Sequence, residues 1–194
     1  GRVMENCEED RGQYDQAGPC FWASGAALMV RSGAYWETEG LDPWFFAHQE
    51  EIDLCWRLKM AGYQVYVQPA SVVYHVGGGT LPPGPGKIFL NFRNNLVMLA
   101  KNLPWGQLLW KLPLRFGLNG LAALHFLAGG RIGYFWAVMR SFGAFFGWLF
   151  IGRKQSIFPR KRKALSGPGW YRGSLLWDYY ARGRRTFSQI VGRN

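Results

Sequence analysis

All but one of the acidic residues of this chain lie before residue 81, and this division constrains the fold more than any single motif. Residues 1–80 hold 5 Lys+Arg and 11 Asp+Glu, a net charge of −6. Residues 81–194 hold 18 Lys+Arg, six of the ten tryptophans and a single acid, Asp178. A basic segment rich in Trp and Phe is typical of proteins that contact a membrane surface or a nucleic acid.

Composition excludes several classes of protein. Among the 194 residues, 48% are hydrophobic and 18% charged, which excludes a disordered chain. Cys7, Cys20 and Cys55 are too few and too scattered for a disulfide scaffold, and they form no CxxC zinc motif. Their odd number suits a reducing compartment. The chain begins at a glycine without a signal-peptide pattern, and we expect it to be the later part of a longer protein.

The sequence pattern predicts short elements before residue 86 and long helices after it. We expect a buried strand or tight turn at 26–30, a helix capped by Ser32, and a helix over 50–61 that ends at Gly62. Strands are predicted over 63–68 and 71–76, followed by a Gly/Pro-rich loop over 77–86. A further helix over 87–102 precedes the apolar stretches 105–128 and 131–151.

The predicted helix over 50–61 carries most of the candidate chemistry. Glu51, Leu54, Cys55 and Leu58 share one stripe, so Glu51 is a carboxylate on a face that is otherwise apolar. Burial raises the pKa of such a group, and a positioned general base is one interpretation. The alternative is that Glu50, Glu51 and Asp53 only complement the positive end of the helix dipole. Asp53 and Arg57, on another side, are spaced for an ion pair.

A second candidate lies where the strand predicted over 71–76 meets the glycines that follow it. His75 would present its imidazole there, in a position where α/β proteins bind ligands. Imidazole suits a metal ion or a phosphate group. The alternative is an ordinary histidine of a surface loop.

Together these segments resemble the carboxy-terminal half of the catalytic domain of family 2 glycosyltransferases, the inverting GT-A type, with rhamnosyltransferase-like spacing. The matching pieces, in order, are WASGAA with Arg31, GLDPWFF, EEIDLCWR, AGY and VVYHVGG. The resemblance is specific over residues 20–80 and weaker over 81–104. It implies an α/β fold: a partial GT-A domain followed by an apolar, basic helical tail, divided as 1–86, 87–163 and 164–194.

The resemblance also implies a reaction and a set of site residues. Such enzymes transfer a sugar from a nucleotide-diphosphate sugar to an acceptor hydroxyl with inversion. The position of the general base is that of Glu51, with Glu50 as the rival. Trp22 and Gly25 match the loop that lies near the sugar and the acceptor. Asp42 matches a residue on the acceptor side of the site. Arg93 could reach a diphosphate. His75 matches a position that helps hold a divalent metal, Mg²⁺ or Mn²⁺, or the diphosphate.

The sequence departs from the family pattern in places. The family more often has Asp where Glu51 stands, and its D-x-D metal motif does not occur here. We therefore expect the nucleotide-binding half to precede this chain, and the chain alone not to bind the donor properly. Residues 91–95 do not match the Gln-x-x-Arg-Trp motif of processive members, which favours single additions. An Arg on an ordinary helix surface is the alternative for Arg93.

The tail predicts contact with a membrane. Residues 132–151 form a 20-residue apolar stretch with Arg140 near its middle. We favour helices that lie in the membrane plane or re-enter it, over a true span or an ordinary core helix. The basic run 152–163 would then bind anionic headgroups at the cytoplasmic face. A lipid-linked or saccharide acceptor, and a role in cell-surface polysaccharide or glycolipid synthesis, would suit such a location.

Two other functions compete with a membrane-associated glycosyltransferase. One is a non-enzymatic, basic membrane-binding module in which the acidic segment is only a scaffold. The other is nucleic-acid binding through residues 81–194, which carry a net charge of +17. No helix-turn-helix, RRM or zinc pattern supports the latter, so nucleic acid is not among the expected partners.

Overall fold

The computed structural model describes residues 2–3, 6–75 and 81–191, and they form two compact units. One unit contains residues 22–65 and 73–165, and the other contains residues 1–21, 66–72 and 166–194. The predicted division into residues 1–86, 87–163 and 164–194 differs from this grouping and stays a prediction. Residues 22–65 and most of 87–163 share one core, because the helix predicted over 87–102 packs against the helix predicted over 50–61.

The larger unit begins with short elements that lead to the helix of the candidate site. A 3-10 turn, η1 (Gly25–Ala27), precedes α1 (Ser32–Glu37), and η2 (Pro43–Phe45) precedes α2 (Glu50–Ala61). The tight turn predicted near residue 26 is confirmed, but no buried strand forms there. Ser32 lies within α1, whose N-cap is Arg31 without a capping side chain, so the predicted cap is wrong.

Helix α2 has the predicted bounds, and its end is explained by one glycine. Gly62 adopts a left-handed conformation, φ +103°, and its N–H bonds the carbonyls of Leu58 and Lys59. Leu54 and Leu58 pack with Ala34 of α1 in a small apolar cluster. Asp53 and Arg57, although on another side of the helix, are also buried, so α2 is covered on more than one face.

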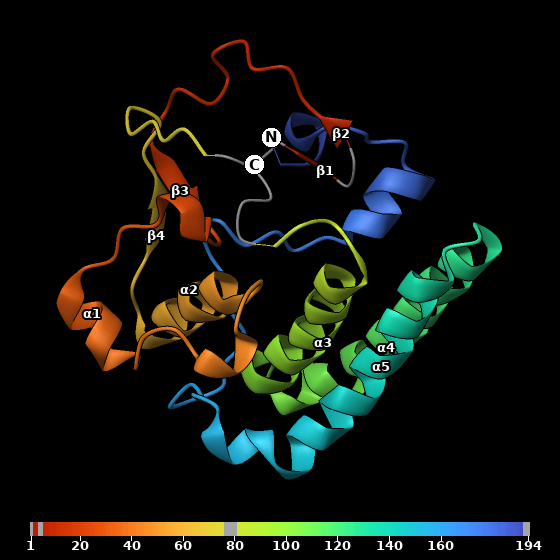
Figure 1. The fold of residues 1–194 in the computed structure, drawn as a ribbon. Helices are drawn as coiled ribbons and strands as arrows, with labels where there is room; N and C mark the ends of the chain where they lie inside the picture. Colours follow the sequence, from red (N-terminus) through yellow and green to blue (C-terminus); the bar gives the residue numbers. More distant parts are fainter. Residues whose placement is uncertain (1, 4–5, 76–80, 192–194) are drawn as a thin grey trace. The chain divides into compact units, whose positions relative to one another are not determined.

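Three long helices complete this unit (Figure 1). They are α3 (Pro85–Asn102), α4 (Trp105–Ala128) and α5 (Ile132–Phe150), followed by the 3-10 turn η3 (Gly152–Gln155). Pro85 starts α3 at a position that needs no N–H partner, and the extended Leu103 before Pro104 ends it. The stop at Pro104 and the helix over 87–102 are thus confirmed, with α3 starting two residues earlier.

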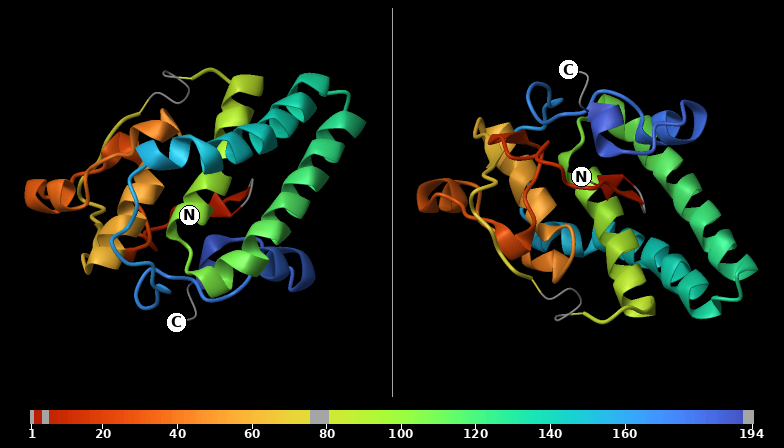
Figure 2. Two further views of the ribbon diagram at one scale, coloured as in Figure 1. Left: turned by 90° about the horizontal axis from the view of Figure 1, so that it is seen from below. Right: turned by 90° about the horizontal axis from the view of Figure 1, so that it is seen from above.

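Helix α5 packs against both α3 and α4, as the two views of Figure 2 show. Its Val138, Phe145 and Trp148 are buried, as are Leu96 and Val97 of α3. Phe116 of α4 lies with its ring centroid 5.0–5.8 Å from those of three phenylalanines of α5: Phe142, Phe145 and Phe146. None of the helices in the described part of the chain meets the length and hydropathy needed to cross a membrane.

The smaller unit contains the first and the last segments of the chain. Strands β1 (Arg2–Val3) and β2 (Asn6–Cys7) form an antiparallel pair, and β3 (Gly18–Cys20) pairs with β4 (Val65–Val67). The π-helical turn η4 (Trp177–Ala181) and α6 (Phe187–Val191) come from the tail. Gly169, at φ +77°, passes so close to Cys20 that a Cβ would lie 2.4 Å from its carbonyl carbon, so only glycine fits.

The strands are shorter than predicted. The strand expected over 63–68 is found only as Val65–Val67, and residues 71–75 form none. Residue 76 and the glycines 77–79 lie outside the described residues, as does part of the predicted loop over 77–86. Within the described residues the sheets have two strands each, so the partial GT-A domain stays a prediction.

Candidate active site

Helix α2 starts from a loop with an unusual backbone. Phe46, His48 and Gln49 all have positive φ angles, at 63°, 69° and 75°, although none of them is glycine. Non-glycine residues rarely adopt this region, and where they do the surrounding structure must hold them there. Glu50 and Glu51 follow directly as the first residues of α2, so this loop fixes where both carboxylates lie.

The two carboxylates share one cavity with the predicted glycine. The cavity has a volume of about 410 Å³. Its lining residues are Gly25, Leu28, Val30, Tyr35, Leu41, Glu50, Glu51 and Leu54. A Cβ built on Gly25 would lie 3.9 Å from the Cβ of Glu51, so the η1 backbone approaches the base of that side chain. The structure thus brings together Gly25, Glu50 and Glu51, three of the residues that the sequence singled out.

The environment of Glu51 is poor in groups that stabilise a negative charge. Burial is the main cause that raises its pKa above the ordinary value of 4.5, and the neighbouring Glu50 adds to the rise. Backbone N–H groups of Glu51 and Gln49 oppose it in part. The Oε2 atoms of both glutamates are buried without a hydrogen-bond partner. Glu51 therefore lines the cavity as a carboxyl group with a raised pKa, a property that suits a general base.

His48 adds a third titratable group to this region. Its Nε2 atom is buried without a hydrogen-bond partner. Burial is the main cause that lowers the His48 pKa from 6.5, Lys87 lowers it further, and Glu51 opposes the change. The imidazole is thus favoured in its neutral form near the Glu51 carboxylate.

A buried network of charges lies on another side of α2. Asp53 receives hydrogen bonds from Arg57 Nε at 2.9 Å, Lys101 Nζ at 3.0 Å and Asn102 Nδ2 at 2.7 Å. Lys101 also bonds Asp42, and all of these charged side chains are almost completely buried. The predicted Asp53–Arg57 ion pair is confirmed. That pair lies within α2 and is buried, whereas the hydrogen bonds from Lys101 and Asn102 to Asp53 anchor α2 to α3.

Asp42, predicted on the acceptor side, belongs to this network. Its Oδ2 accepts from Lys101 and from the backbone N–H of Ile157 at 3.0 Å, and its Oδ1 caps η2 through the N–H of Trp44 at 2.9 Å. The side chain is 1% exposed and does not line the cavity of Glu50 and Glu51. Its surroundings are those of a residue that holds the 38–46 segment in place.

Arg93 is engaged in the same way. Its Nη2 donates to the carbonyl oxygens of Trp44 at 3.2 Å and Phe45 at 3.1 Å, and its guanidinium lies 5.4 Å from the ring centroid of Phe89. Burial lowers the Arg93 pKa. The structure therefore shows neither an extended side chain that reaches for a diphosphate nor an ordinary surface arginine.

Trp22 is 42% exposed and does not line the cavity.

The described residues do not provide a metal site. They contain no group of three or more His, Cys, Asp or Glu side chains that could hold a metal ion. His75 is exposed, and the residues that follow it lie outside the described part. The divalent metal, Mg²⁺ or Mn²⁺, whose main motif we expect to lie outside this chain, stays a prediction.

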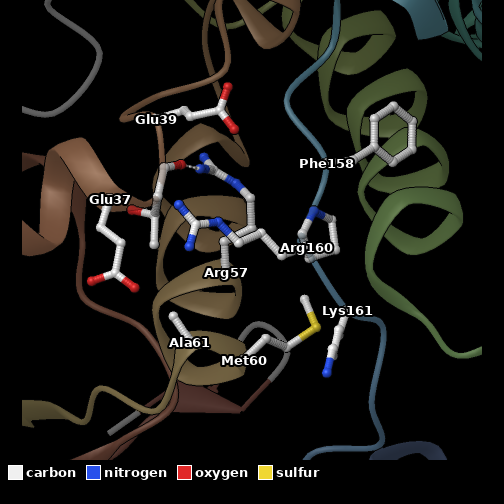
Figure 3. Close-up of a pocket in the computed structure, with 10 residues that line it drawn as sticks. Glu37, Glu39, Arg57, Met60, Ala61, Phe158, Arg160 and Lys161 are labelled. Carbon is white, nitrogen blue, oxygen red and sulfur yellow. Dashed lines mark hydrogen bonds between the residues drawn. The ribbon is translucent and has the colours of Figure 1, made fainter.

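A second cavity, of about 260 Å³, lies beside the buried network (Figure 3). Figure 3 shows Glu37 and Glu39 on one side of Arg57, with Phe158 and Lys161 of the later segment on the other. Arg57 already donates to Asp53 and to the carbonyls of Thr38 and Gly40. Both acidic and basic side chains line this cavity. Its electrostatic potential is therefore neither clearly positive nor clearly negative, as selection of a charged substrate would require.

Sequence reasoning missed Asn94, Lys101 and Asn102. A signal for two of them was present, because Asn94, Val97, Met98 and Lys101 recur at the spacing of one helix face. Polar residues at both ends of an apolar stripe indicate buried polar contacts. Which partners they meet depends on the 38–48 segment, more than 40 residues earlier, and no local pattern contains that information.

Comparison with known proteins identifies rhamnosyltransferases as relatives, which supports a relationship with glycosyltransferases. The chain is 33% identical over 108 residues to N-acetylglucosaminyl-diphospho-decaprenol L-rhamnosyltransferase of Mycobacterium tuberculosis, in strains CDC 1551 and H37Rv. This match covers 55% of the chain and 34% of the relative.

Rhamnosyltransferase WbbL of Escherichia coli K12 is 35% identical over 54 residues, 28% of the chain and 20% of the relative. The chain thus matches about a third or less of the length of these relatives. No family model matches the chain. No solved structure matches it either.

Proposed function

We propose that the protein that contains this chain is an inverting, family 2 glycosyltransferase with a GT-A catalytic domain, and that Glu51 is its general base. The observation that carries the proposal is the cavity in which Glu51, with its raised pKa and free Oε2, lies beside Gly25. The rhamnosyltransferase relatives support the same class of reaction.

The proposed reaction is a single displacement at the anomeric carbon of a nucleotide-diphosphate sugar. Glu51 removes the proton of an acceptor hydroxyl while that oxygen forms a bond to the anomeric carbon. The bond from this carbon to the diphosphate oxygen breaks, and the nucleoside diphosphate leaves with the bonding electrons. Attack from the face opposite the leaving group inverts the configuration. A carboxylate with a raised pKa suits this role, because general bases work best when their pKa lies near the operating pH.

The relatives suggest the substrates. Their names specify transfer of rhamnose, in two cases to a sugar carried on decaprenyl diphosphate. We propose a rhamnosyl nucleotide donor and a lipid-linked acceptor for this protein, with a role in cell-surface polysaccharide synthesis.

A lipid-linked acceptor would place the enzyme at a membrane surface, and two exposed apolar rows support such a location. Leu109, Leu114, Leu121 and Leu124 of α4 are all more than half exposed, as are Ile132, Trp136, Phe146 and Phe150 of α5. Arg140 is exposed on α5 as well, and neither helix contains an acid. We propose that these helices lie in the plane of the cytoplasmic surface, with anionic headgroups near the basic run 152–163.

Part of that basic run is already engaged in the protein. Arg162 lies 4.7 Å from the ring centroid of Trp105, and Arg153 lies 5.6 Å from that of Phe158. Lys154, Arg160, Lys161 and Lys163 are exposed, so they are the candidates for headgroup contacts.

The test compares two isosteric variants of the complete protein, Glu51→Gln and Glu50→Gln. Glu51→Gln should bind the nucleotide-sugar donor normally in calorimetry but lose transfer by about 10²–10⁴-fold, as expected for a lost general base. Glu50→Gln is the matched control, because it removes the neighbouring carboxylate, and it should transfer far better. Equal activity of Glu51→Gln and the wild type would refute the role of Glu51.

If no transfer is observed at all, the alternative is a non-enzymatic membrane-binding module. The exposed apolar rows of α4 and α5 and the acid-free basic run are the observations that favour it. That module would still bind vesicles that contain anionic lipid.

A further inference from the structure

We propose that Arg93 and Asn94 of α3 form a positioning pair, which holds the loop before α2 in its left-handed conformation and thereby sets the place of the Glu50 and Glu51 carboxylates. This inference rests on the proposed function for its catalytic meaning. The positioning itself can be measured without any sugar transfer.

The first observation is the set of contacts made by one buried amide. Asn94 is completely buried, and its Nδ2 lies 2.9 Å from the carbonyl oxygen of Phe45 and 2.8 Å from those of Ala47 and His48. An amide nitrogen has only two hydrogens, so these carbonyls share them. Three carbonyl oxygens that converge on one side chain from a distant helix define the path of the loop between them.

The second observation is that Arg93 fixes which way this amide faces. The Arg93 Nε–H donates to Asn94 Oδ1 at 2.8 Å, which leaves the NH₂ group directed at the loop. The same guanidinium bonds the carbonyls of Trp44 and Phe45 through Nη2. Two adjacent residues thus donate hydrogen bonds to carbonyl oxygens along residues 44–48, and one of the two donors carries a positive charge.

The third observation is that the loop needs such support. The positive φ angles of Phe46, His48 and Gln49 are unfavourable for residues with a Cβ, so a free loop would leave them. Left-handed residues turn their neighbours' carbonyls away from the regular direction of the chain. In this loop those carbonyls point at Asn94, and its hydrogen bonds compensate for the strain.

The conformation of this loop determines where the first turn of α2 begins, through one residue. Gln49 is the left-handed N-cap of α2 and has no capping side chain, so the first turn depends on the loop that precedes it. Glu50 and Glu51 are the next two residues. Asn94 does not line their cavity and does not touch the reacting atoms, so it acts only by fixing the loop.

The first measurement uses the 194-residue chain and requires no substrate. Asn94→Asp keeps the shape but replaces the NH₂ group by an oxygen that repels the three carbonyls. Amide hydrogen exchange over residues 46–51 should become faster by at least about tenfold, because the loop opens locally. The titration of Glu51, followed by carboxyl-carbon NMR, should return toward the ordinary pKa as the side chain gains solvent.

Asn91→Ala is the matched control on the same helix. Asn91 donates only to the Lys87 carbonyl at 3.0 Å, within α3, so its loss should leave both the exchange and the titration unchanged. If Asn94→Asp folds but leaves the exchange of 46–51 and the Glu51 titration as in the wild type, the positioning pair is refuted.

Arg93→Lys decides the question if Asn94→Asp does not fold. Lysine keeps the charge but lacks the Nε–H that orients the Asn94 amide. We expect a smaller change of the same kind in exchange and titration, and no change in either would refute the proposal.

The second measurement separates this inference from the proposed function. In the complete protein, Asn94→Asp should lower kcat with the KM for the donor unchanged, since the base is misplaced while the donor contacts remain. A loop that loosens in a protein without transferase activity would support the positioning and refute the proposed function. An active enzyme in which Asn94→Asp changes neither the loop nor kcat would refute the positioning alone.

Discussion

At the scale of single residues, Glu51 is held where its charge is poorly stabilised. Burial and the nearby Glu50 raise its pKa, and one of its oxygens has no hydrogen-bond partner. Such an arrangement lowers the stability of the folded protein, and proteins retain it at functional sites. Asp53, two residues along the same helix, shows the opposite case, because every contact it makes satisfies its charge.

Glu51→Gln should therefore stabilise the protein near neutral pH. A carboxyl group with a raised pKa in the folded state binds its proton more strongly there than in the unfolded state, so stability falls as pH rises from about 4.5 through the folded pKa. The neutral amide removes that loss. Because the cavity is open to solvent, we expect a gain near the low end of about 0.5–2 kcal/mol at pH 7. Urea unfolding at pH 7 and pH 4 measures it, and a gain that is equal at both values would contradict this explanation.

Asp53→Asn should have the opposite effect. The substitution leaves Lys101 and Arg57 buried with less compensating charge. Breaking a buried ion pair on one side typically costs about 3–5 kcal/mol. Thermal unfolding of the 194-residue chain should show a large loss of stability, whereas Glu9→Gln, in an exposed pair with Arg11, should change it little. A small effect of Asp53→Asn would mean that the network is not maintained in solution.

At the scale of elements, sequence reasoning was most accurate where a local signal is strong. Gly62 and Pro104 end α2 and α3 as predicted, and the stripe through Glu51 and Leu54 placed the carboxylate that lines the cavity. The positions of Asp42 and Arg93 could not be predicted in the same way. Both depend on contacts between α3 and the 38–48 segment, which only the folded chain brings together.

The strand predicted over 71–76 failed for a related reason. Alternating apolar residues indicate a strand only where another strand supplies partners for the backbone. The described residues 71–75 have no such partner, and Val72 and Tyr74 are exposed.

At the scale of the whole molecule, the division of charge matches the proposed location. The acid-poor half contributes α4 and α5 with their exposed apolar rows, and the acidic half contributes the cavity of Glu50 and Glu51. A peripheral membrane enzyme needs both a surface that binds lipid and a site that binds a soluble donor.

If the protein binds membranes as proposed, charge attraction and apolar burial should contribute to the binding separately. Because the Debye length falls from about 10 Å at 0.1 M salt to about 3 Å at 1 M, high salt should release only the fraction held by charge. Detergent should release the remainder, which is held by apolar side chains. Flotation with anionic vesicles measures both fractions, and Trp136→Asp with Phe150→Asp should reduce the salt-resistant one. A protein that stays unbound at low salt would refute the membrane contact.

Donor binding tests where the nucleotide site lies. The 194-residue chain contains no D-x-D motif, so we expect it to show no measurable binding of a nucleotide-sugar in calorimetry with Mg²⁺ or Mn²⁺. The complete protein should bind under the same conditions. Micromolar binding by the chain alone would mean that the donor site lies within these residues.

The pH dependence of kcat/KM for the complete protein tests the central claim most directly. A general base must be deprotonated to act, so activity should rise with pH through the pKa of Glu51, which lies above 4.5. Glu51→Gln should lose this acid limb along with most of the activity, and Glu50→Gln should retain the limb at a lower pH because a nearby negative charge is gone. An acid limb that persists unchanged in Glu51→Gln would contradict the assignment of Glu51 as the base.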